Sequence, residues 1–211
     1  MTETGQRKTV RGYVLAGGGS TRFGRDKALV EIGAQPMLLR MHKLLDGVAE
    51  EVGVIAAPEK YASLGLKCIA DLWPGEGPLG GIVTALLHTE ETDPKSAWNL
   101  VLSCDMPFLT PDWLEFLATR ATKSAAQVIL PFSAGGPEPL CACWRTDAAR
   151  TLRAAFESGV RKVTDGVALL RSEVLDEADW KRFDSAERLF WNMNTAADFE
   201  EVRRIWEAER A

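Results

Sequence analysis

The chain has 211 residues, of which 46% are hydrophobic and 26% are charged, a composition typical of a globular protein with a sizeable core. Its formal net charge of -5 argues against general nucleic-acid binding, which requires a basic face, but it is compatible with a local basic pocket. No apolar run approaches about 18 residues and residues 1–9 are polar, so we expect no membrane span, no signal peptide and a cytoplasmic protein.

The four cysteines are Cys68, Cys104, Cys141 and Cys143. The Cys-x-Cys spacing of the last two would suit a pair of soft-metal ligands. On a strand, however, residues two apart share one face, and free cysteine is a common buried residue. We therefore expect reduced cysteines in the core rather than a zinc or iron–sulfur site.

A glycine-rich loop follows the first predicted strand. Residues 9–16 are mostly apolar, with β-branched and aromatic side chains, and this pattern predicts a buried strand. The next residues, Gly17, Gly18 and Gly19, would be costly inside a helix or a sheet. In a loop, their backbone N–H groups can turn toward an anion.

Three cations follow these glycines closely, namely Arg22, Arg25 and Lys27. Backbone donors and nearby cations together predict a phosphate site, and the alternative is a glycine turn with a solvated basic face. The P-loop pattern would need Lys-Ser/Thr after Gly24, where Arg25 and Asp26 stand. The dinucleotide fingerprint would need a glycine at Arg22, so neither standard motif applies.

Beyond this loop, buried strands alternate with helices, a pattern typical of a mostly parallel, three-layer α/β sheet. We expect strands over residues 51–57, 67–71, 97–103, 127–131 and 174–175, and helices over 36–48, 79–88, 147–158, 163–170 and 196–208, with another beginning at Pro111. Ligands of such sheets bind at the carboxyl ends of the strands. Gly17, Asp71 and Asp105 each follow a predicted strand, so they can face one pocket.

The segment 71–82 is rich in proline and glycine. Proline restricts the backbone, and glycine allows a ligand to approach it closely. The helix that follows begins near the pocket and can stabilise negative charge. The alternative is a tight structural turn. Asp105 has a comparable alternative, because an aspartate before a turn often bonds only the nearby backbone.

The stretch 15–28 resembles a signature of nucleotidyltransferases that load a nucleotide onto a phosphorylated acceptor, Leu-Ala-Gly-Gly-x-Ser-x-Arg-Met-Gly-x-Asp-Lys-Ala. Phe23 replaces the usual methionine. The two glycines after Ala16 are typical of molybdenum cofactor guanylyltransferases, whereas cytidylyltransferases for the same cofactor usually carry Leu-Ala-Ala-Gly. Further similarities, spread from Val14 to Val202, include Cys-Asp-Met-Pro at 104–107, Glu-Pro-Leu at 138–140 and Asn-x-Asn-Thr at 192–195.

This resemblance implies a three-layer, Rossmann-like nucleotidyltransferase fold with a mostly parallel sheet flanked by helices. It implies a single domain over 9–208, with a nucleotide-binding part at about 9–110 and an acceptor-binding part at about 111–208. The implied enzyme transfers GMP from GTP to the phosphate of molybdopterin, giving the guanine dinucleotide cofactor and pyrophosphate. Proteins of molybdoenzyme maturation are candidate partners.

The resemblance also implies roles for individual residues. Arg22 and Lys27 would hold the phosphate chain, and Asp105 would bind Mg²⁺, which prefers hard oxygen ligands. The implied nucleotide-binding residues are Leu15, Ala16, Gly17, Gly18, Gly19, Lys27, Asp71 and Gly80. Asn192 and Asn194 would lie toward the pterin acceptor.

Some positions keep more than one interpretation. Thr195 and Asp198 can be explained by capping of the last helix, which does not explain Asn192. Glu138 is either a solvated turn residue, which we favour, or part of the acceptor cleft. Arg161 and Lys162 lie at a helix start, where cations are slightly disfavoured, and this hints at an anionic partner.

The sequence departs from the family pattern after the second strand, where the usual nucleotide-contacting asparagine is replaced by Ile-Ala-Ala at 55–57. This departure weakens any detailed claim about recognition of the base or ribose. The nearest alternative enzyme is a cytidylyltransferase or a sugar-1-phosphate nucleotidylyltransferase, and the Asn-x-Asn-Thr segment at 192–195 speaks against it. A nucleotide-binding regulator without turnover is the alternative of another class, and the combination of Lys27 with Asp105 disfavours it.

Overall fold

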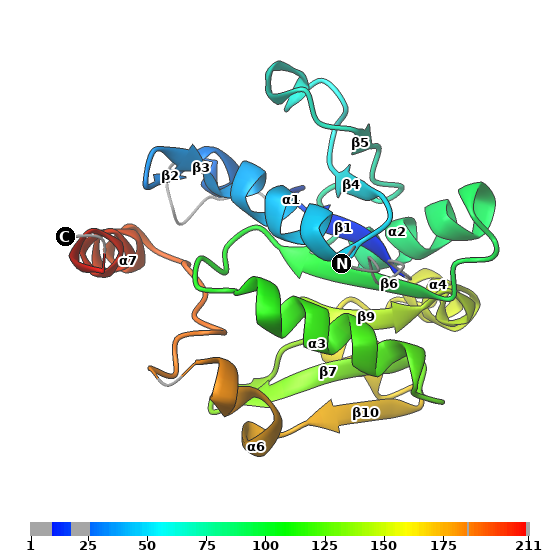
Figure 1. The fold of residues 1–211 in the computed structure, drawn as a ribbon. Helices are drawn as coiled ribbons and strands as arrows, with labels where there is room; N and C mark the ends of the chain where they lie inside the picture. Colours follow the sequence, from blue (N-terminus) through cyan, green and yellow to red (C-terminus); the bar gives the residue numbers. More distant parts are fainter. Residues whose placement is uncertain (1–9, 18–25, 185, 210–211) are drawn as a thin grey trace, which may run out of the picture.

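The computed structural model describes residues 10–17, 26–184 and 186–209. Within these ranges, a central sheet has the strand order β10-β7-β9-β6-β1-β4-β5, with β8 paired to β7 (Figure 1). Its strands are β1 (Arg11–Leu15), β4 (Val52–Ile55), β5 (Cys68–Ile69), β6 (Trp98–Ser103), β7 (Val128–Ser133), β8 (Gly136–Pro137), β9 (Cys141–Arg145) and β10 (Ser172–Leu175).

The sheet is mostly parallel, as the sequence predicts. Strand β1 pairs in parallel with β4 and β6, β4 with β5, and β7 with β10. Strand β9 runs against its neighbours, pairing antiparallel with β6 and β7, and the short β8 pairs antiparallel with β7. Because β9 is reversed, its first residues lie beside the carboxyl end of β6, where Leu102 pairs with Cys141.

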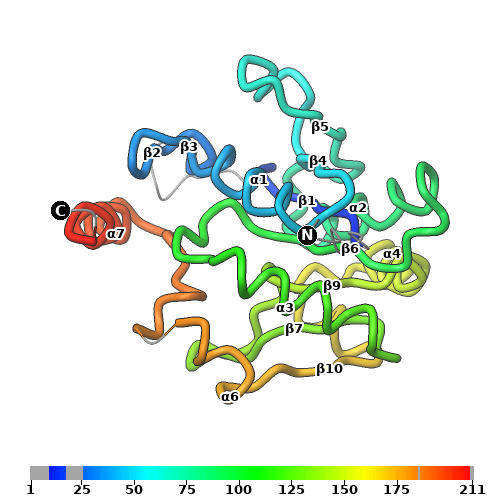
Figure 2. The backbone as a smooth tube through the Cα atoms, in the orientation of Figure 1, coloured from blue at the N-terminus to red at the C-terminus, as the bar shows by residue number. Residues whose placement is uncertain are grey.

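Helices cover both faces of the sheet, so that the molecule has three layers, and the path of the chain through them can be traced in Figure 2. One face carries α1 (Met37–Val48) and α3 (Pro111–Thr122), with α6 (Glu177–Trp180) and α7 (Ala196–Ala208) at its margin. The other face carries α2 (Pro78–Thr92), α4 (Ala149–Glu157) and α5 (Val163–Val167). Side chains alternate accordingly, because Val14 packs into the first layer and Tyr13 into the second.

Several expected helix ends are confirmed by their capping contacts. The Thr110 hydroxyl accepts a hydrogen bond from the Trp113 amide at 3.3 Å, and Pro111 occupies the first turn of α3. Thr195 and Asp198 form a reciprocal capping box at the start of α7.

Other boundaries differ from the expectation. Helix α5 ends at Val167 rather than at residue 170, because the Leu169 and Leu170 amides bond to carbonyls three residues back and tighten the turn. Helix α2 continues past residue 88 to Thr92, carrying the buried Thr89 into contact with the Tyr13 hydroxyl. Where a single helix is expected over residues 147–158, the structure has a short 3₁₀ turn, η3 (Thr146–Ala148), followed by α4.

Two small features have no counterpart in the sequence-based expectation. A hairpin of β2 (Glu31–Ile32) and β3 (Gln35–Pro36) turns at Gly33 and Ala34, whose φ angles are 61° and 62°. Helix α6 has its own capping box, formed by Asp176 and Asp179. Among the helices that the structure describes, none has the length and apolar character needed to cross a membrane.

Candidate nucleotide-binding site

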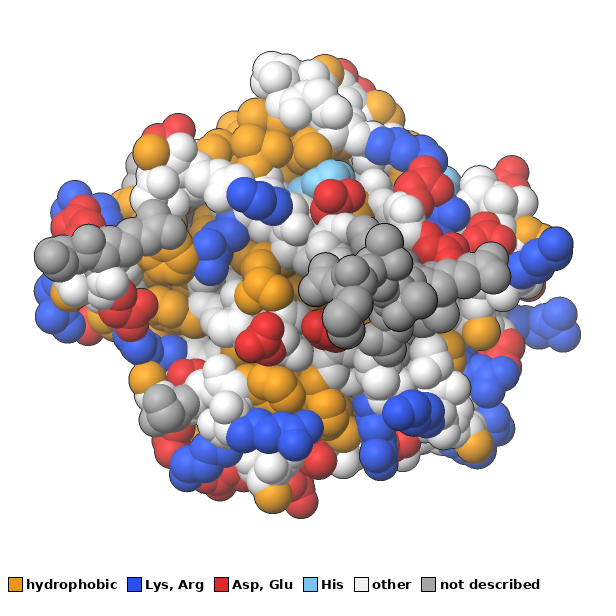
Figure 3. Space-filling model, viewed as in Figure 1, with side chains coloured by type: hydrophobic (Ala, Val, Ile, Leu, Met, Phe, Trp, Pro, Cys, Tyr) orange, Lys and Arg blue, Asp and Glu red, His pale blue; other side chains and the backbone are white. Residues whose placement is uncertain are grey.

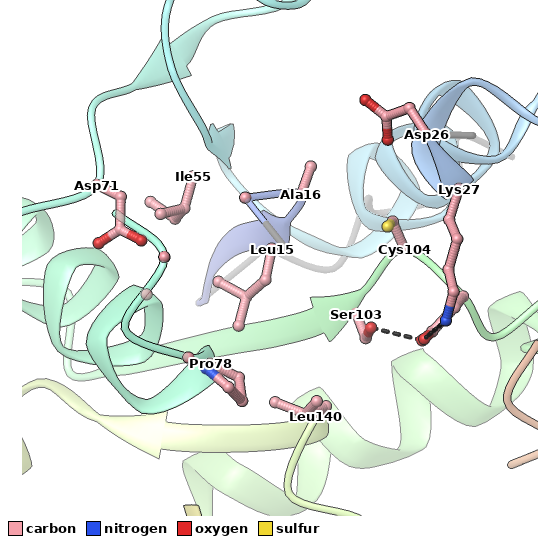
Figure 4. A pocket seen from close by; sticks show the side chains of 15 residues that line it. Leu15, Ala16, Asp26, Lys27, Ile55, Asp71, Pro78, Ser103, Cys104 and Leu140 are labelled. Carbon is pink, nitrogen blue, oxygen red and sulfur yellow. Dashed lines mark hydrogen bonds and ion pairs between the residues drawn. The ribbon is translucent and has the colours of Figure 1, made fainter. Parts of the chain in front are cut away.

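A cavity of about 290 Å³ opens at the carboxyl edge of the sheet (Figure 4). Three expected positions meet there: Gly17 after β1, Asp71 after β5 and Asp105 after β6. The lining residues are Leu15, Ala16, Gly17, Asp26, Lys27, Ile55, Asp71, Gly75, Gly77, Pro78, Gly81, Ser103, Cys104, Asp105 and Leu140.

Lys27 crosses one side of the cavity toward a carboxylate and an amide. Its Nζ lies 3.4 Å from Asp105 Oδ2 and donates a hydrogen bond to Asn194 Oδ1 at 2.9 Å. The Lys27 and Asp105 side chains are each only 16% exposed, so their charges are shielded from bulk water more than those of a surface pair. A cation is thus held at the cavity by polar groups that a phosphate oxygen can replace or join.

Three contacts hold Asp105 in place. Its Oδ1 accepts a hydrogen bond from the Ser103 hydroxyl at 2.5 Å, while Oδ2 faces Lys27. The Met193 amide donates to the Asp105 carbonyl at 2.9 Å. This backbone bond brings the segment with Asn192 and Asn194 to the carboxyl end of β6. Asn194 can therefore contact Lys27, which lies 167 positions earlier in the sequence.

Asp71 lies across the cavity from Lys27 (Figure 4). Its Oδ1 accepts hydrogen bonds from the Thr84 hydroxyl at 3.1 Å and from the Trp73 amide at 3.0 Å. Its Oδ2 lies toward Gly17, 3.8 Å from the place where a Cβ on that glycine would stand. One carboxylate oxygen is therefore held by the protein, and the other is directed to the loop after β1.

The segment between β5 and α2 is fixed by packing on the second helical layer. The Trp73 and Phe156 rings pack at a tilt of 46° with their centroids 4.9 Å apart, and the Arg161 guanidinium lies 4.1 Å from the centre of the Phe156 ring. Arg161 also pairs with Glu76 at 2.8 Å. The positive charge that hinted at an anionic partner thus meets a carboxylate of this same segment.

The glycines around the start of α2 have separate positions. Gly75 and Gly77, with φ angles of 82° and 97°, line the cavity together with Gly81. Gly80 does not line the cavity. The side of Gly80 where a Cβ would stand faces Phe156 and Trp73, and that Cβ would lie 3.3–3.4 Å from their side chains. Its role is therefore close packing of α2 on Phe156 rather than contact with the cavity.

Glu138 and Asn192 lie beyond Asp105, on the side formed by the β8–β9 connection. The Ser133 hydroxyl donates to Glu138 Oε1 at 2.7 Å, and Asn192 donates to the Phe190 carbonyl at 3.1 Å. Burial is the main cause that raises the pKa of Glu138, with the Ser133 and Asn192 side chains acting in the opposite direction. Glu138 is thus a half-buried carboxylate beside Asn192 rather than a fully solvated turn residue.

The thiols are unsuited to nucleophilic chemistry. Burial and the neighbouring Asp105 carboxylate raise the pKa of Cys104 to about 12, so the cysteine in the cavity wall stays protonated. Cys141 and Cys143 are buried on the α3 side of β9, where Trp113 Nε1 donates to Cys141 Sγ at 3.4 Å. The expectation that these two cysteines share one core face is confirmed.

The donor set suits a hard divalent cation that brings other ligands with it. No group of three His, Cys, Asp or Glu side chains comes together anywhere in the described ranges. Asp105 offers a carboxylate beside the cavity, and Mg²⁺ characteristically uses one or two protein carboxylates together with phosphate and water oxygens. The predicted positions Gly18, Gly19 and Arg22 lie outside the described residues.

Ser103 and Thr84 belong to this site but carry no sequence motif that would identify them. Each is buried and holds a carboxylate, Asp105 or Asp71, through its hydroxyl group. The only signal available in the sequence is that Ser103 lies two residues before Asp105 at a strand end.

Comparison with known proteins matches residues 12–174 to the family model of the MobA-like NTP transferase domain. A protein of Pelotomaculum thermopropionicum named probable molybdenum cofactor guanylyltransferase is 32% identical over 200 residues, 94% of each chain. A relative of the same name from Mycobacterium bovis is 35% identical over 190 residues, covering 88% of this chain and 89% of its own. The crystal structure of molybdopterin-guanine dinucleotide biosynthesis protein A from Archaeoglobus fulgidus superposes with a TM-score of 0.81 at 26% identity, covering 94% of this chain and all of that one.

Proposed function

The chain belongs to the family of MobA-like NTP transferase domains, and from that premise we propose that it transfers GMP from GTP to the terminal phosphate of molybdopterin. The products are the guanine dinucleotide form of the cofactor and pyrophosphate. One observation carries this proposal: the Lys27 ammonium lies at the cavity, 3.4 Å from Asp105 Oδ2 and 2.9 Å from Asn194 Oδ1.

The nucleotide lies with its phosphates at the carboxyl end of β1, beside Gly17. Lys27 neutralises charge on the phosphate chain as the bond between the α-phosphorus and the pyrophosphate oxygen breaks. Asp105 would hold a Mg²⁺ ion, which would supply further positive charge to offset the charge of the phosphates. The acceptor phosphate oxygen forms the new bond to the α-phosphorus, and pyrophosphate leaves.

This reaction does not need a general base, because the attacking phosphate is already an anion. Most of the rate then comes from positioning and from fixed charges around the phosphates. The rigid attachments of Lys27 to Asn194 and of Asp105 to Ser103 supply such positioning.

The base and ribose face the opposite wall, where Asp71 presents Oδ2. A carboxylate oxygen there accepts hydrogen bonds from the N–H groups of guanine or from ribose hydroxyls. This acceptor compensates for the side-chain amide that the sequence lacks at residues 55–57. We assign nucleotide binding to residues 9–110 and acceptor binding to 111–208, with Asn192 and Asn194 supplied by the latter.

The distribution of surface charge is consistent with small-molecule substrates. On the face shown in Figure 3, side chains of both signs are interspersed and do not gather into one broad basic surface. A broad basic surface would be expected for a protein that binds nucleic-acid backbones.

The test is a product assay with molybdopterin, Mg²⁺ and one nucleotide at a time. We expect GTP to give a guanine dinucleotide and one pyrophosphate per product, detected by mass spectrometry and by phosphate release after pyrophosphatase treatment. Formation of the cytosine dinucleotide instead would move the chain to the cytidylyl branch. Absence of any dinucleotide with a folded protein would contradict the proposal.

A further inference from the structure

The Tyr61 hydroxyl lies between two elements of the candidate site. It is 2.9 Å from Asp26 Oδ2 and 3.0 Å from the Ala16 carbonyl oxygen, and the side chain is 0% exposed. Ala16 directly follows β1, and Asp26 immediately precedes the helical turn η1 (Lys27–Leu29). One buried phenol therefore connects the end of the first strand to the turn that carries Lys27.

Asp26 transmits this contact to the backbone of η1. Its Oδ1 accepts a hydrogen bond from the Ala28 amide at 3.1 Å and caps the turn, while Oδ2 is held by Tyr61 and by Lys60 Nζ at 2.9 Å. A single turn has few hydrogen bonds of its own, so its orientation depends strongly on its cap. The direction in which Lys27 leaves η1 is thus tied to the orientation of the Asp26 carboxylate.

The two partners of Asp26 Oδ2 are not equivalent. Lys60 is 38% exposed and can follow the carboxylate as it moves, whereas Tyr61 is enclosed and cannot. The phenol also remains a donor, because burial and the Asp26 carboxylate raise the pKa of Tyr61. Tyr61 is therefore the rigid reference for the Asp26 carboxylate, and Lys60 is an adaptable contact.

We propose that Tyr61 is a positioning residue that aims the Lys27 ammonium at the phosphates through Asp26. The inference rests on the proposed function of Lys27. It assigns a role in the site to a residue between β4 and β5 and to the aspartate of the Asp26-Lys27 pair.

The test compares Y61F, K27A and the double variant, with K60M as the matched control that removes only the exposed partner of Asp26. Turnover at saturating GTP and acceptor is measured together with thermal unfolding. We expect Y61F to lower kcat by about tenfold, since small misplacements of a positioned group can cost up to about 10² in rate. We expect K60M to stay within about twofold of the unmodified protein, the range for a partner that adapts.

The decisive comparison is the effect of Y61F in the K27A background. If Tyr61 acts through Lys27, the rate loss disappears there, while any loss of thermal stability from Y61F persists in both backgrounds. An equal rate loss with and without Lys27, or an unchanged kcat for Y61F beside an impaired K27A, would overturn the inference.

Two further results keep the test decisive. If Y61F does not fold, D26N replaces it, because an amide of the same size has only one acceptor oxygen and cannot accept from both the Ala28 amide and the Tyr61 hydroxyl. Its rate loss must show the same dependence on Lys27. A K27A variant with an unchanged rate would overturn the proposed role of Lys27 itself, and the inference with it, without reference to any Tyr61 variant.

Discussion

At the scale of single residues, Lys27 combines a fixed position with a charge directed at the cavity. Its ammonium contacts Asp105 and Asn194, which come from segments far apart in the sequence. Both partners lie in motifs for which the resemblance implied other roles, Mg²⁺ binding for Asp105 and a place toward the acceptor for Asn194. In the proposed reaction, contact of Lys27 with phosphate oxygens is the central electrostatic interaction.

Replacing Lys27 by alanine is expected to lower turnover by about 10²–10³, the scale of one preorganised electrostatic contact. Steady-state kinetics at saturating GTP measure this directly, and circular dichroism checks that the variant is folded. A folded K27A variant that turned over at the unmodified rate would remove Lys27 from the mechanism.

Asp105→Ala is expected to abolish magnesium-dependent turnover, because a Mg²⁺ ion at the cavity would lose its protein carboxylate. The measurement is activity across a titration of Mg²⁺, with Asp105→Asn as a variant of equal size. Unmodified activity at limiting Mg²⁺ would show that the metal ligand lies elsewhere.

Residues that position others were not predictable from the sequence. Lys27, Asp71 and Asp105 belong to motifs or follow predicted strands, so their placement around one cavity could be anticipated. Tyr61 contacts a residue 35 positions earlier, and Thr84 one 13 positions earlier, through hydroxyl groups that form no motif. Such contacts depend on how the loops fold over the sheet edge, which local patterns do not specify.

At the scale of elements, helix α2 supports the cavity wall through its first two turns. The Thr84 hydroxyl lies 2.9 Å from the Gly80 carbonyl oxygen and 3.1 Å from Asp71 Oδ1, and it accepts a hydrogen bond from the Leu72 amide at 3.1 Å. The buried start of α2 is thereby connected to the segment after β5. Asp71 keeps its direction toward Gly17 because this helix holds its other oxygen.

Thr84→Val is expected to weaken GTP binding by about tenfold, the equivalent of roughly one buried hydrogen bond. Thr84→Ser is the matched control, since it keeps the hydroxyl and should bind GTP like the unmodified protein. Calorimetric titration of both variants provides the comparison. Equal affinities for the two variants would contradict the positioning of Asp71 by Thr84.

Elements were predicted well where a local rule is strong and less well where packing decides. Pro111 after Thr110 and Asp198 after Thr195 are short-range capping signals, and both helices begin where these signals lie. The early end of α5 follows from the tight turn in which the Leu169 and Leu170 amides bond to the Gly166 and Val167 carbonyls, a turn that no local sequence pattern marks. The reversed strand β9 likewise depends on its neighbours rather than on its own composition.

At the scale of the whole molecule, a chain of largely buried hydrogen bonds joins the sheet to the helical layer that contains α2. Its steps are Tyr13 OH to His88 Nδ1 at 2.8 Å and to Thr89 Oγ1 at 2.6 Å, then Thr89 Oγ1 to Asn99 Oδ1 at 2.6 Å. Asn99 continues the chain to the Thr146 hydroxyl at 3.0 Å. Since Asn99 Oδ1 can only accept, the donors run in one direction and begin at a protonated Nδ1 of His88.

Acid is expected to destabilise the fold partly through His88. Burial, with Lys67 and Arg11 nearby, lowers the pKa of His88 below its ordinary value of 6.5, although Glu51 and Glu91 oppose this shift. The unfolded chain then binds more protons than the folded chain as the pH falls through 6.5, so stability decreases toward pH 5.

His88→Asn keeps a donor for Tyr13 and removes this titration. The variant should therefore lose less stability between about pH 7 and pH 5 than the unmodified protein, as measured by chemical unfolding at each pH. His42, whose pKa is also lowered by burial, accounts for part of the slope that remains. An identical pH dependence of the two proteins would contradict this assignment.

The most direct measurement is isothermal titration of the purified protein with GTP, CTP and ATP, each with and without Mg²⁺. We predict that GTP binds most tightly and that Mg²⁺ strengthens its binding. This effect of Mg²⁺ should be lost in the Asp105→Ala variant. Preference for CTP would keep the arrangement of the site but contradict guanylyl transfer. Failure of all three nucleotides to bind would contradict the assignment of this cavity as the nucleotide site.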